Sequence, residues 1–451
     1  MKKTEKKLLN FIEKDKKDKL IKLFDEVNIV DMAGLIDKLS IKDLVYVFKV
    51  IHLDVAGSLF SYMSEERQNR LADLLTSQQL SQILDNVYTD DAVNFLEKLD
   101  RPMIRNILSY TSEERRNLLM EMLTYPEDSA GAMMSTDYVE IGQYIKVSDA
   151  TELIKRHQDQ AEMLDTYYVT DINKKLVGVV SIREILFAPD EELIDTIMTK
   201  EVISVTLNDN QEDVAKKMAK YDLASLPVID ETDSFIGFIS ADDIIDIVEE
   251  EATEDIHRMG GIIDIEGSYL HTSAKSMAKS RIFWLLILTV AYTVSSFIIT
   301  GYDDLITTLP SLMIFVPLLM DTAGDAGSQA LAMVVRGIAV DGIDTSYFKE
   351  VFFKELKVAM IAGGFLFFGN LLRIMFFSTN TNNFWLAFVV SLTVFFVVII
   401  AKLIGGLLPL IALYFNQDPA AMASPLITTL SDSVSLLLYF SIAKLFLERL
   451  V

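Results

Sequence analysis

The sequence predicts a multi-domain membrane protein: an all-α superhelical domain, a tandem α/β domain, a connecting helix and a transmembrane domain of five α-helices. Three observations predict this order. The first 128 residues contain a helical repeat, residues 129–256 contain a duplicated strand–turn–strand–helix pattern, and residues 281–451 contain five long apolar runs. A chain of 451 residues is also too long for one ordinary domain. We therefore expect domains at 1–128, 129–256 and 281–451, with a connector at 257–280.

Charge and cysteine content limit the classes of ligand that the chain can bind. Nearly all of the net charge of −24 lies in the first 280 residues, which disfavours a nucleic-acid partner. Inorganic cations are one explanation of this charge and solubility is the other, and composition does not separate them. The chain has no cysteine, so disulfides and thiolate metal sites are excluded, whereas metals with oxygen ligands remain open.

The helical repeat is seen in two segments 48 residues apart. The segment LFSYMSEERQNRL at 59–71 recurs as ILSYTSEERRNLL at 107–119. In each copy a serine, Ser64 or Ser112, precedes two glutamates, which predicts an N-cap followed by acids at the positive end of a helix. A period of this length indicates stacked helix pairs in a short superhelical domain.

The α/β domain is predicted from two versions of one pattern. TYYVTDINKKLVGVVSIREIL and ASLPVIDETDSFIGFISADDII each read as an apolar strand, a polar turn, a strand containing Gly178 or Gly237, and a helix start. Met134 and Met198 open the two copies. The N-terminus is basic but lacks the apolar core of a signal peptide, so we expect these domains to be cytoplasmic.

Five runs have the roughly 20 residues that a bilayer-spanning helix needs. The loop 336–357 contains four basic residues and the loop 301–308 contains none, which predicts the former inside and the C-terminus outside. The expected spans are Ile282–Thr300, Leu309–Val335, Val358–Phe377, Phe384–Phe415 and Pro419–Leu447.

The residue that most strongly indicates function is Asp432, near the middle of the last span. A charge at bilayer depth costs roughly 2.5–3.5 kcal/mol on insertion scales and usually marks an ion or substrate path. The alternative is a protonated or internally hydrogen-bonded aspartate that helps helices to pack. We favour the path, because intramembrane acids normally face a polar interior.

The second span adds two acids, Asp321 and Asp325, four residues apart. Its Pro317, Gly324 and Gly327 predict an interrupted helix whose backbone carbonyls line a cavity. Close helix packing is the alternative explanation for the small residues, although it does not explain the carboxylates. One five-helix unit is a thin wall for a polar pore, so we expect a symmetric homodimer with the pore between subunits. The ion would be a hard dication such as Mg²⁺, which keeps several waters.

A second acidic cluster, ADDIIDIVEEEATEDIHRMGG, joins the α/β domain to the membrane. Like charges at helical spacing are destabilising unless something neutralises them, although a solvated acidic face is the usual explanation. Cytosolic cations bound here would close the joint and gate the pore, because a ligand favours the state that it binds better. The acids of this cluster that we assign to metal are Asp243, Asp246, Glu251, Glu254 and Asp255.

The α/β pattern resembles a tandem pair of cystathionine-β-synthase (CBS) modules, on Leu226-Pro-Val228 and the Gly-x-x-Ser turns at 178–181 and 237–240. The whole chain resembles the MgtE family of magnesium transporters. The specific stretches are Tyr125–Gly131, Glu251–Asp255, Gly327-Ser-Gln329 with Arg336-Gly337, and Asp418-Pro-Ala420 leading to Pro425 and Asp432.

The resemblance implies a homodimeric, multi-pass protein of the plasma membrane with a Mg²⁺-selective pore and a connector that acts as a plug helix. Asp432 would bind the hydrated ion, and cytosolic Mg²⁺ would hold the soluble domains together. Further cytosolic ligands implied are Glu212, Asp222 and the Ala219 carbonyl, with Asp90 or Asp91 bridging the helical domain to the CBS pair. The resemblance also makes ATP a candidate ligand of the CBS pair, without a nucleotide fingerprint. Where the family often has Gly-Gly-Asn, this chain has Ala323-Gly324-Asp325, which adds a charge beside the expected path.

Two other functions compete. A transporter of the same architecture could carry Mn²⁺ or Co²⁺, although the four histidines all lie outside the spans and cysteine is absent. A membrane-tethered adenylate sensor would transport nothing. The sequence does not predict an enzyme, because it has no GxxxxGK[ST], HExxH or GxSxG motif. Transport would be passive, with the interior-negative potential favouring dication entry.

Overall fold

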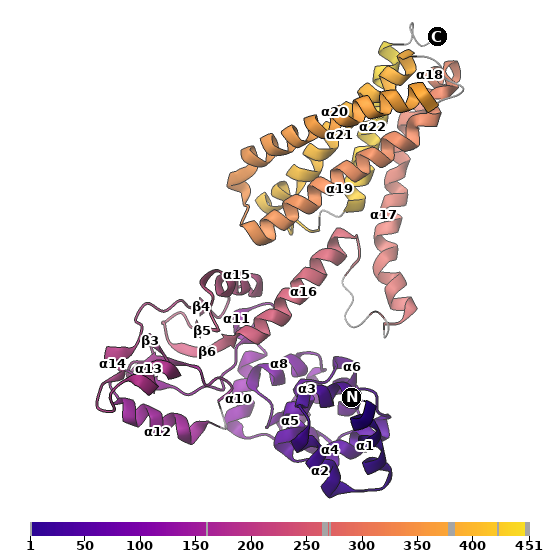
Figure 1. Cartoon of the computed structure of the whole chain (residues 1–451). Helices are drawn as coiled ribbons and strands as arrows, with labels where there is room; N and C mark the ends of the chain where they lie inside the picture. The colour runs from indigo at the N-terminus through magenta and orange to yellow at the C-terminus, as the bar shows by residue number, and fades with distance from the viewer. Residues whose placement is uncertain are drawn as a thin grey trace. The chain divides into compact units, whose positions relative to one another are not determined.

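The computed structural model describes residues 2–158, 161–263, 269, 272–377, 384–421 and 424–446. The chain divides into two compact units, Met1–Glu250 and Glu251–Val451, which are described separately below. Figure 1 shows the helices and strands of both units along the chain.

The first unit begins with short helices joined by tight turns, as the repeat predicts. They are α1 Lys2–Glu13, α2 Lys17–Glu26, α3 Ile29–Ile36, α4 Ile41–Val50, α5 Leu53–Ser61, α6 Glu65–Ala72, α7 Ser77–Leu84, α8 Thr89–Glu97, α9 Arg101–Leu108 and α10 Glu113–Met122. Ser64 and Ser112 are the N-cap residues of α6 and α10, and Ser112 Oγ accepts a hydrogen bond from the Arg115 amide at 3.3 Å.

The repeat extends to an arginine that the sequence did not single out. Arg67 of α6 donates to the carbonyl oxygens of Asp37 and Leu39, just after α3. Its counterpart one repeat later, Arg115 of α10, donates to the carbonyls of Leu84 and Val87 at the end of α7. Each arginine thus satisfies carbonyls that a helix end leaves without partners.

The tandem α/β domain follows. Its elements are α11 Ala130–Met133, β1 Ile141–Gly142, α12 Val147–His157, β2 Thr166–Thr170, β3 Leu176–Ser181, α13 Ile182–Phe187, α14 Ile194–Ile197, β4 Val205–Thr206, α15 Gln211–Tyr221, β5 Ser225–Ile229, β6 Phe235–Ser240 and α16 Ala241–Met259. Two three-stranded sheets have the same topology, β1-β2-β3 and β4-β5-β6. In each the first pair is parallel and the second antiparallel, with Val169 opposite Gly178 and Val228 opposite Gly237.

Gly178 and Gly237 are needed because the methionine that opens one copy of the pattern packs against the glycine-containing strand of the other copy. A Cβ at Gly178 would lie 2.4 Å from Met198 Sδ, and a Cβ at Gly237 would lie 2.6 Å from the Ser135 carbonyl oxygen and 3.1 Å from Met134 Sδ. Met134, which opens the first copy, therefore packs on the second copy. Apolar residues of the helical domain and of the second module form one continuous core, which positions α8 against the start of α16.

The second unit consists mainly of long helices (Figure 1). They are α17 Ala274–Gly301, α18 Asp303–Thr308, the 3-10 helix η1 Pro310–Phe315, α19 Val316–Asp341, the 3-10 helix η2 Thr345–Tyr347, α20 Phe348–Phe377, α21 Phe384–Tyr414 and α22 Ser424–Leu445. Within the described residues, four helical segments are long and apolar enough to cross a membrane: Ala274–Gly301, Thr345–Phe376, Phe384–Tyr414 and Ser424–Leu445.

The second expected span differs from the prediction. It is α19, a long helix of mixed composition outside that set of four, and it begins at Val316 after η1. The expected interruption was wrong, because α19 continues through Gly324 and Gly327 to Asp341. Pro317 lies in the first turn, where its missing N–H costs nothing. The glycines serve the packing that was the alternative explanation: a Cβ at Gly324 would lie 2.8 Å from Thr428 Cγ2.

The predicted connector is divided between two helices in the described residues. Its first residues end α16 at Met259 and its last residues begin α17 at Ala274. Residues 264–268, 270 and 271 of the connector lie outside the described residues. A separate plug helix therefore stays a prediction.

Candidate functional site

The second unit, Glu251–Val451, contains the four candidate spans and is called the membrane unit below. It contains the acids predicted for the ion path. Asp321 and Asp325 are both exposed and lie on one face of α19, with Gln329 one turn further on. We call these three residues the α19 ridge. The opposite face of α19 is buried by α21 and α22, with Gly327 against Ile427 and Ala401. Small residues thus hold α19 close to its neighbours and leave its polar face open.

Asp432 lies on α22, half-buried, and Asp321 is the charged group that acts on it most directly. Its Oδ1 atom is buried and accepts no hydrogen bond from the residues that the structure describes. Two carboxylates close enough to repel each other, one of them with an unpartnered oxygen, form an anionic site suited to a dication. The structure therefore joins two of the three predicted pore residues into one pair, with Asp325 on the next turn of α19.

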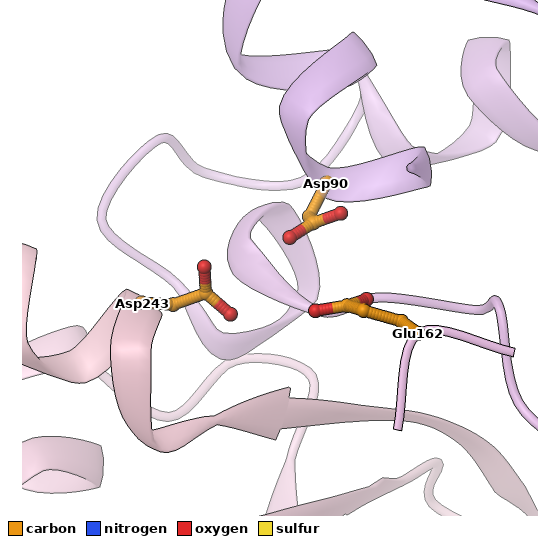
Figure 2. Close-up of side chains that lie close together, drawn as sticks. All are labelled: Asp90, Glu162 and Asp243. Carbon is orange, nitrogen blue, oxygen red and sulfur yellow. The ribbon is translucent and has the colours of Figure 1, made fainter. Parts of the chain in front are cut away.

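The first unit, Met1–Glu250, was predicted to be cytoplasmic and is called the soluble unit below. It contains a second anionic site, which we call the acid cluster: Asp90, Glu162 and Asp243. One carboxylate oxygen from each lies within 4.8 Å of the others, and this is the one such group of three found among the described residues. Figure 2 shows the three carboxylates pointing toward one another from α8, from the segment before β2 and from the start of α16. Asp90 Oδ1 and Glu162 Oε2 are buried and receive no hydrogen bond from the described part of the chain.

Local structure explains how residues so far apart meet. The Asp137 carboxylate accepts a hydrogen bond from the Thr89 amide at 2.7 Å and so caps α8 directly before Asp90. The carbonyl of the same Asp137 accepts a bond from the Glu162 amide at 2.9 Å. Asp243 lies in the first turn of α16, where Ser240 Oγ donates to its carboxylate and accepts from its amide. One capping aspartate and one capping serine therefore fix all three acids.

The electrostatics of the acid cluster are unfavourable without a cation. Burial raises the pKa of Asp243 to about 6, with Asp242 and Asp91 adding to the shift. Burial and the neighbouring acids raise the pKa of both Asp90 and Glu162. Clustered carboxylates resist ionisation when buried, and a bound dication is what would hold all three charged. Oxygen donors alone suit Mg²⁺, Ca²⁺ or Mn²⁺.

The structure places the remaining predicted cytosolic ligands differently. Asp91, beside Asp90, faces Asp242 and the exposed Asp246 of α16, and burial raises its pKa. Glu254 pairs with Arg258, which also binds Asp418 in the segment before α22. The carboxylates of Glu254 and Asp418 are therefore neutralised by the guanidinium group of Arg258. Glu251 and Asp255 continue the same helix, α16.

Glu212 and Asp222 are not brought together. They lie at the two ends of α15, about 15 Å apart along the axis. Glu212 pairs with Lys216 at 2.6 Å, and Asp222 ends the helix in the left-handed conformation (φ 51°). Ala219 is exposed on the last turn. Within one subunit these three residues cannot surround a single ion.

Sequence reasoning missed Glu162 of the acid cluster and Asp137, which caps α8 beside it. It also missed two basic residues, Arg258 beside the predicted ligand Glu254 and Lys402, which is buried in α21. Glu162 and Asp137 lie in loops with no local signal, so only the tertiary structure finds them. Arg258 could have been found as the one arginine in the acidic run, and Lys402 as a basic residue in the middle of an apolar span.

Comparisons with known proteins agree with this architecture. Residues 316–442 match the profile of the MgtE divalent cation transporter family. Residues 27–128 match the MgtE intracellular N domain, and residues 130–191 and 194–250 match CBS domains. The chain is 32% identical over 332 residues to a protein named magnesium transporter MgtE of Thermus thermophilus, covering 72% of this chain and 71% of that protein. It is 33% identical over 327 residues to the protein of the same name of Enterococcus faecalis, with the same coverage of 72% and 71%.

Two solved structures resemble the soluble unit. The soluble part of a magnesium transporter has a TM-score of 0.54 and 31% sequence identity, covering 56% of this chain and 99% of the other. The cytosolic domain of the Mg²⁺ channel MgtE in complex with ATP has a TM-score of 0.50 and 27% identity, covering 53% of this chain and 98% of the other.

Proposed function

Because the chain belongs to the MgtE family of divalent cation transporters, we propose that it carries Mg²⁺ passively through a pore between two identical subunits. Cytosolic Mg²⁺ bound in the soluble domains closes this pore. The observation that carries the proposal is the pair of Asp432 and Asp321, with Asp432 Oδ1 buried and unpartnered among the described residues.

The exposure of the α19 ridge supports the dimer. Asp321 and Asp325 lie on the surface of a bundle whose other helices are apolar. Acidic side chains at membrane depth do not face hydrocarbon, so another polar surface has to cover this one. A second copy related by a two-fold axis would place both ridges across one path and double the carboxylates that face an ion.

Ion chemistry supports Mg²⁺ over softer metals. Every candidate ligand is a carboxylate or an amide, and oxygen ligands suit hard dications. Mg²⁺ sheds its waters reluctantly, so the ridge would contact a hydrated ion. Mn²⁺ also accepts oxygen ligands and is the competing ion to include in any test.

The acid cluster is the proposed cytosolic sensor. Asp90 comes from the helical domain and Asp243 from α16, whose residues run past Glu250 into the second unit of the chain. A cation held by both would favour the arrangement in which they are close, and this is how a ligand shifts a conformational equilibrium. The proposed result is feedback, in which accumulated Mg²⁺ stops further entry.

ATP is a proposed second ligand of the CBS pair. The support is the likeness of the soluble unit to a cytosolic domain solved with ATP. Calorimetric titration of ATP into the purified full chain, with and without Mg²⁺, tests it. Heat of binding at micromolar ATP supports the assignment, and its absence at millimolar ATP contradicts it.

Flux through proteoliposomes tests the main proposal. Wild type and Asp432→Ala are compared for Mg²⁺, Mn²⁺, Co²⁺ and Ca²⁺, with the internal Mg²⁺ chelated to open the pore. Mg²⁺ flux that is lost in the variant supports Asp432 as the pore ligand. Absence of any dication flux in the folded wild type contradicts transport and favours a sensor.

A further inference from the structure

A lysine is buried in the middle of the most apolar candidate span. Lys402 is 7% exposed, and α21 has a mean hydropathy of 2.8 over its most apolar stretch. A charged side chain at this depth is expensive, faces the interior of the bundle and is normally held by specific partners. The proposed ion path uses carboxylates and an amide, so it leaves this cation unexplained.

Two polar side chains from two other helices lie near Lys402. Its Nζ donates to Gln329 Oε1 of α19 at 3.4 Å. From α20, Glu355 is half-buried and experiences the charge of Lys402. Packing supports this placement: a Cβ at Gly406, one turn after Lys402, would lie 2.9 Å from Glu355 Cγ. Lys402 is therefore flanked by the α19 ridge on one side and by a counter-charge on the other.

A backbone contact between α19 and α21 fixes the position of Gln329 and Lys402 along the helix axis relative to Asp325. A Cβ at Gly405 would lie 2.1 Å from the carbonyl oxygen of Gly327, so α19 and α21 touch next to Gln329 and Lys402. Gln329 follows Asp325 by one turn, about 6 Å along the helix axis. Along the ridge, two carboxylates are thus followed by an amide whose oxygen is turned to a buried cation.

Resting on the proposed function, we propose that Lys402 tunes ion release as a positioning residue behind the α19 ridge. Its ammonium group holds Gln329 and weakens the attraction of the ridge for a dication just beyond Asp325. Glu355 balances the lysine, so that the repulsion does not block entry. Conduction needs binding that is strong enough for entry and weak enough for exit. The Lys402 ammonium near Asp325 weakens the binding of the ion and so favours its exit.

The test compares variants of opposite charge effect in the Mg²⁺ flux assay. Lys402→Met keeps the length of the side chain and removes its charge, so the half-saturating Mg²⁺ concentration should fall about three- to tenfold and the maximal flux should fall with it. Glu355→Gln leaves the lysine unbalanced and should raise the half-saturating concentration by a similar factor. A purely structural pair would not give shifts of opposite sign.

Two further variants keep the test decisive if Lys402→Met fails to fold. Lys402→Arg retains the charge and should keep the half-saturating concentration within about twofold of wild type. The double variant Lys402→Met with Glu355→Gln removes both charges and should lie between the single variants. The inference would be overturned if the half-saturating concentration shifted in the same direction in both single variants. It would also be overturned if Glu355→Gln shifted this concentration strongly and the double variant gave the same value as Glu355→Gln. Wild type and Asp432→Ala run beside them, because failed wild-type flux contradicts the proposed function instead.

Discussion

Asp90 and Asp243 lie 153 positions apart in the sequence, yet their carboxylate oxygens approach within 4.8 Å. Asp90 begins α8 of the helical domain and Asp243 begins α16 after the second α/β module. Their contact is built on a continuous apolar core and on the cap that Asp137 provides to α8. Two buried acids held together in this way oppose folding unless they are protonated or share a cation.

We first expect Mg²⁺ to stabilise the soluble unit through the acid cluster. A cation that binds only the folded state at 100 times its dissociation constant adds about 2.7 kcal/mol. Asp243→Asn and Glu162→Gln should each remove most of the Mg²⁺-induced rise in melting temperature, measured on the full chain. Asp31→Asn is the matched control, because Asp31 is an exposed acid in the first turn of α3. An undiminished rise in both cluster variants would contradict this site.

The second prediction concerns pH without dications. The pKa of Asp243 is raised to about 6, so its carboxyl binds a proton more tightly in the folded chain than in the unfolded one. The folded state is therefore favoured below the unfolded pKa of about 4, and this advantage is lost as pH rises through 6. The difference in melting temperature between Asp243→Asn and wild type in chelator should grow from pH 4.5 to 7.5. A difference that stays constant, or shrinks, would show that Asp243 ionises freely.

The third prediction separates Asp325 from the rest of the ridge. Asp325→Asn removes one carboxylate from the proposed path while preserving shape, so the half-saturating Mg²⁺ concentration should rise several-fold. Asp341→Asn is the control, because Asp341 is the exposed last residue of α19 and faces Arg336 at 4.0 Å. Flux is measured in proteoliposomes with chelated interiors. Equal behaviour of the two variants would remove Asp325 from the path.

The fourth prediction concerns the contact between α19 and α21. A methyl group at Gly405 would lie 2.1 Å from a backbone oxygen of Gly327, which a flexible side chain cannot relieve. Gly405→Ala should therefore cost more than about 2 kcal/mol and reduce the yield of monodisperse protein in detergent. Gly369→Ala on α20 meets nothing within 4 Å and is the matched control. A stable Gly405→Ala protein with wild-type flux would mean that this contact is not needed.

The sequence predicted the α/β domain well because short, apolar strands and turn residues carry strong local signals. β2, β3, β5 and β6 fall in the two segments read as strands, and Gly178 and Gly237 stand at equivalent positions in both sheets. The repeat at 59–71 and 107–119 likewise marked α6 and α10 by their N-caps. The error in the second span arose because glycine and proline weaken a helix only in some positions. Pro317 lies in the first turn of α19, and Gly324 and Gly327 leave room for neighbouring helices, which the sequence does not show.

The candidate site residues also differ in how strongly the sequence pointed to them. The sequence singled out Asp321, Asp325 and Asp432 for the proposed ion path because a charge in an apolar run is costly wherever the run folds. Asp90 and Asp91 were weaker predictions, since dozens of exposed acids share their local pattern. Glu162 could not be found, because its role depends on Asp137 joining two segments.

By itself the sequence predicted the order of the helical, α/β and membrane segments and four of the five expected spans, because these follow from composition and periodicity along the chain. Its motifs also resembled the MgtE family, to which the chain belongs. Only the tertiary structure decided which charges meet. It paired Asp432 with Asp321, enclosed Lys402 between Gln329 and Glu355, and gathered Asp90, Glu162 and Asp243. Electrostatic energies depend on distance and burial in space, and residues far apart in sequence acquire both only when the helices pack.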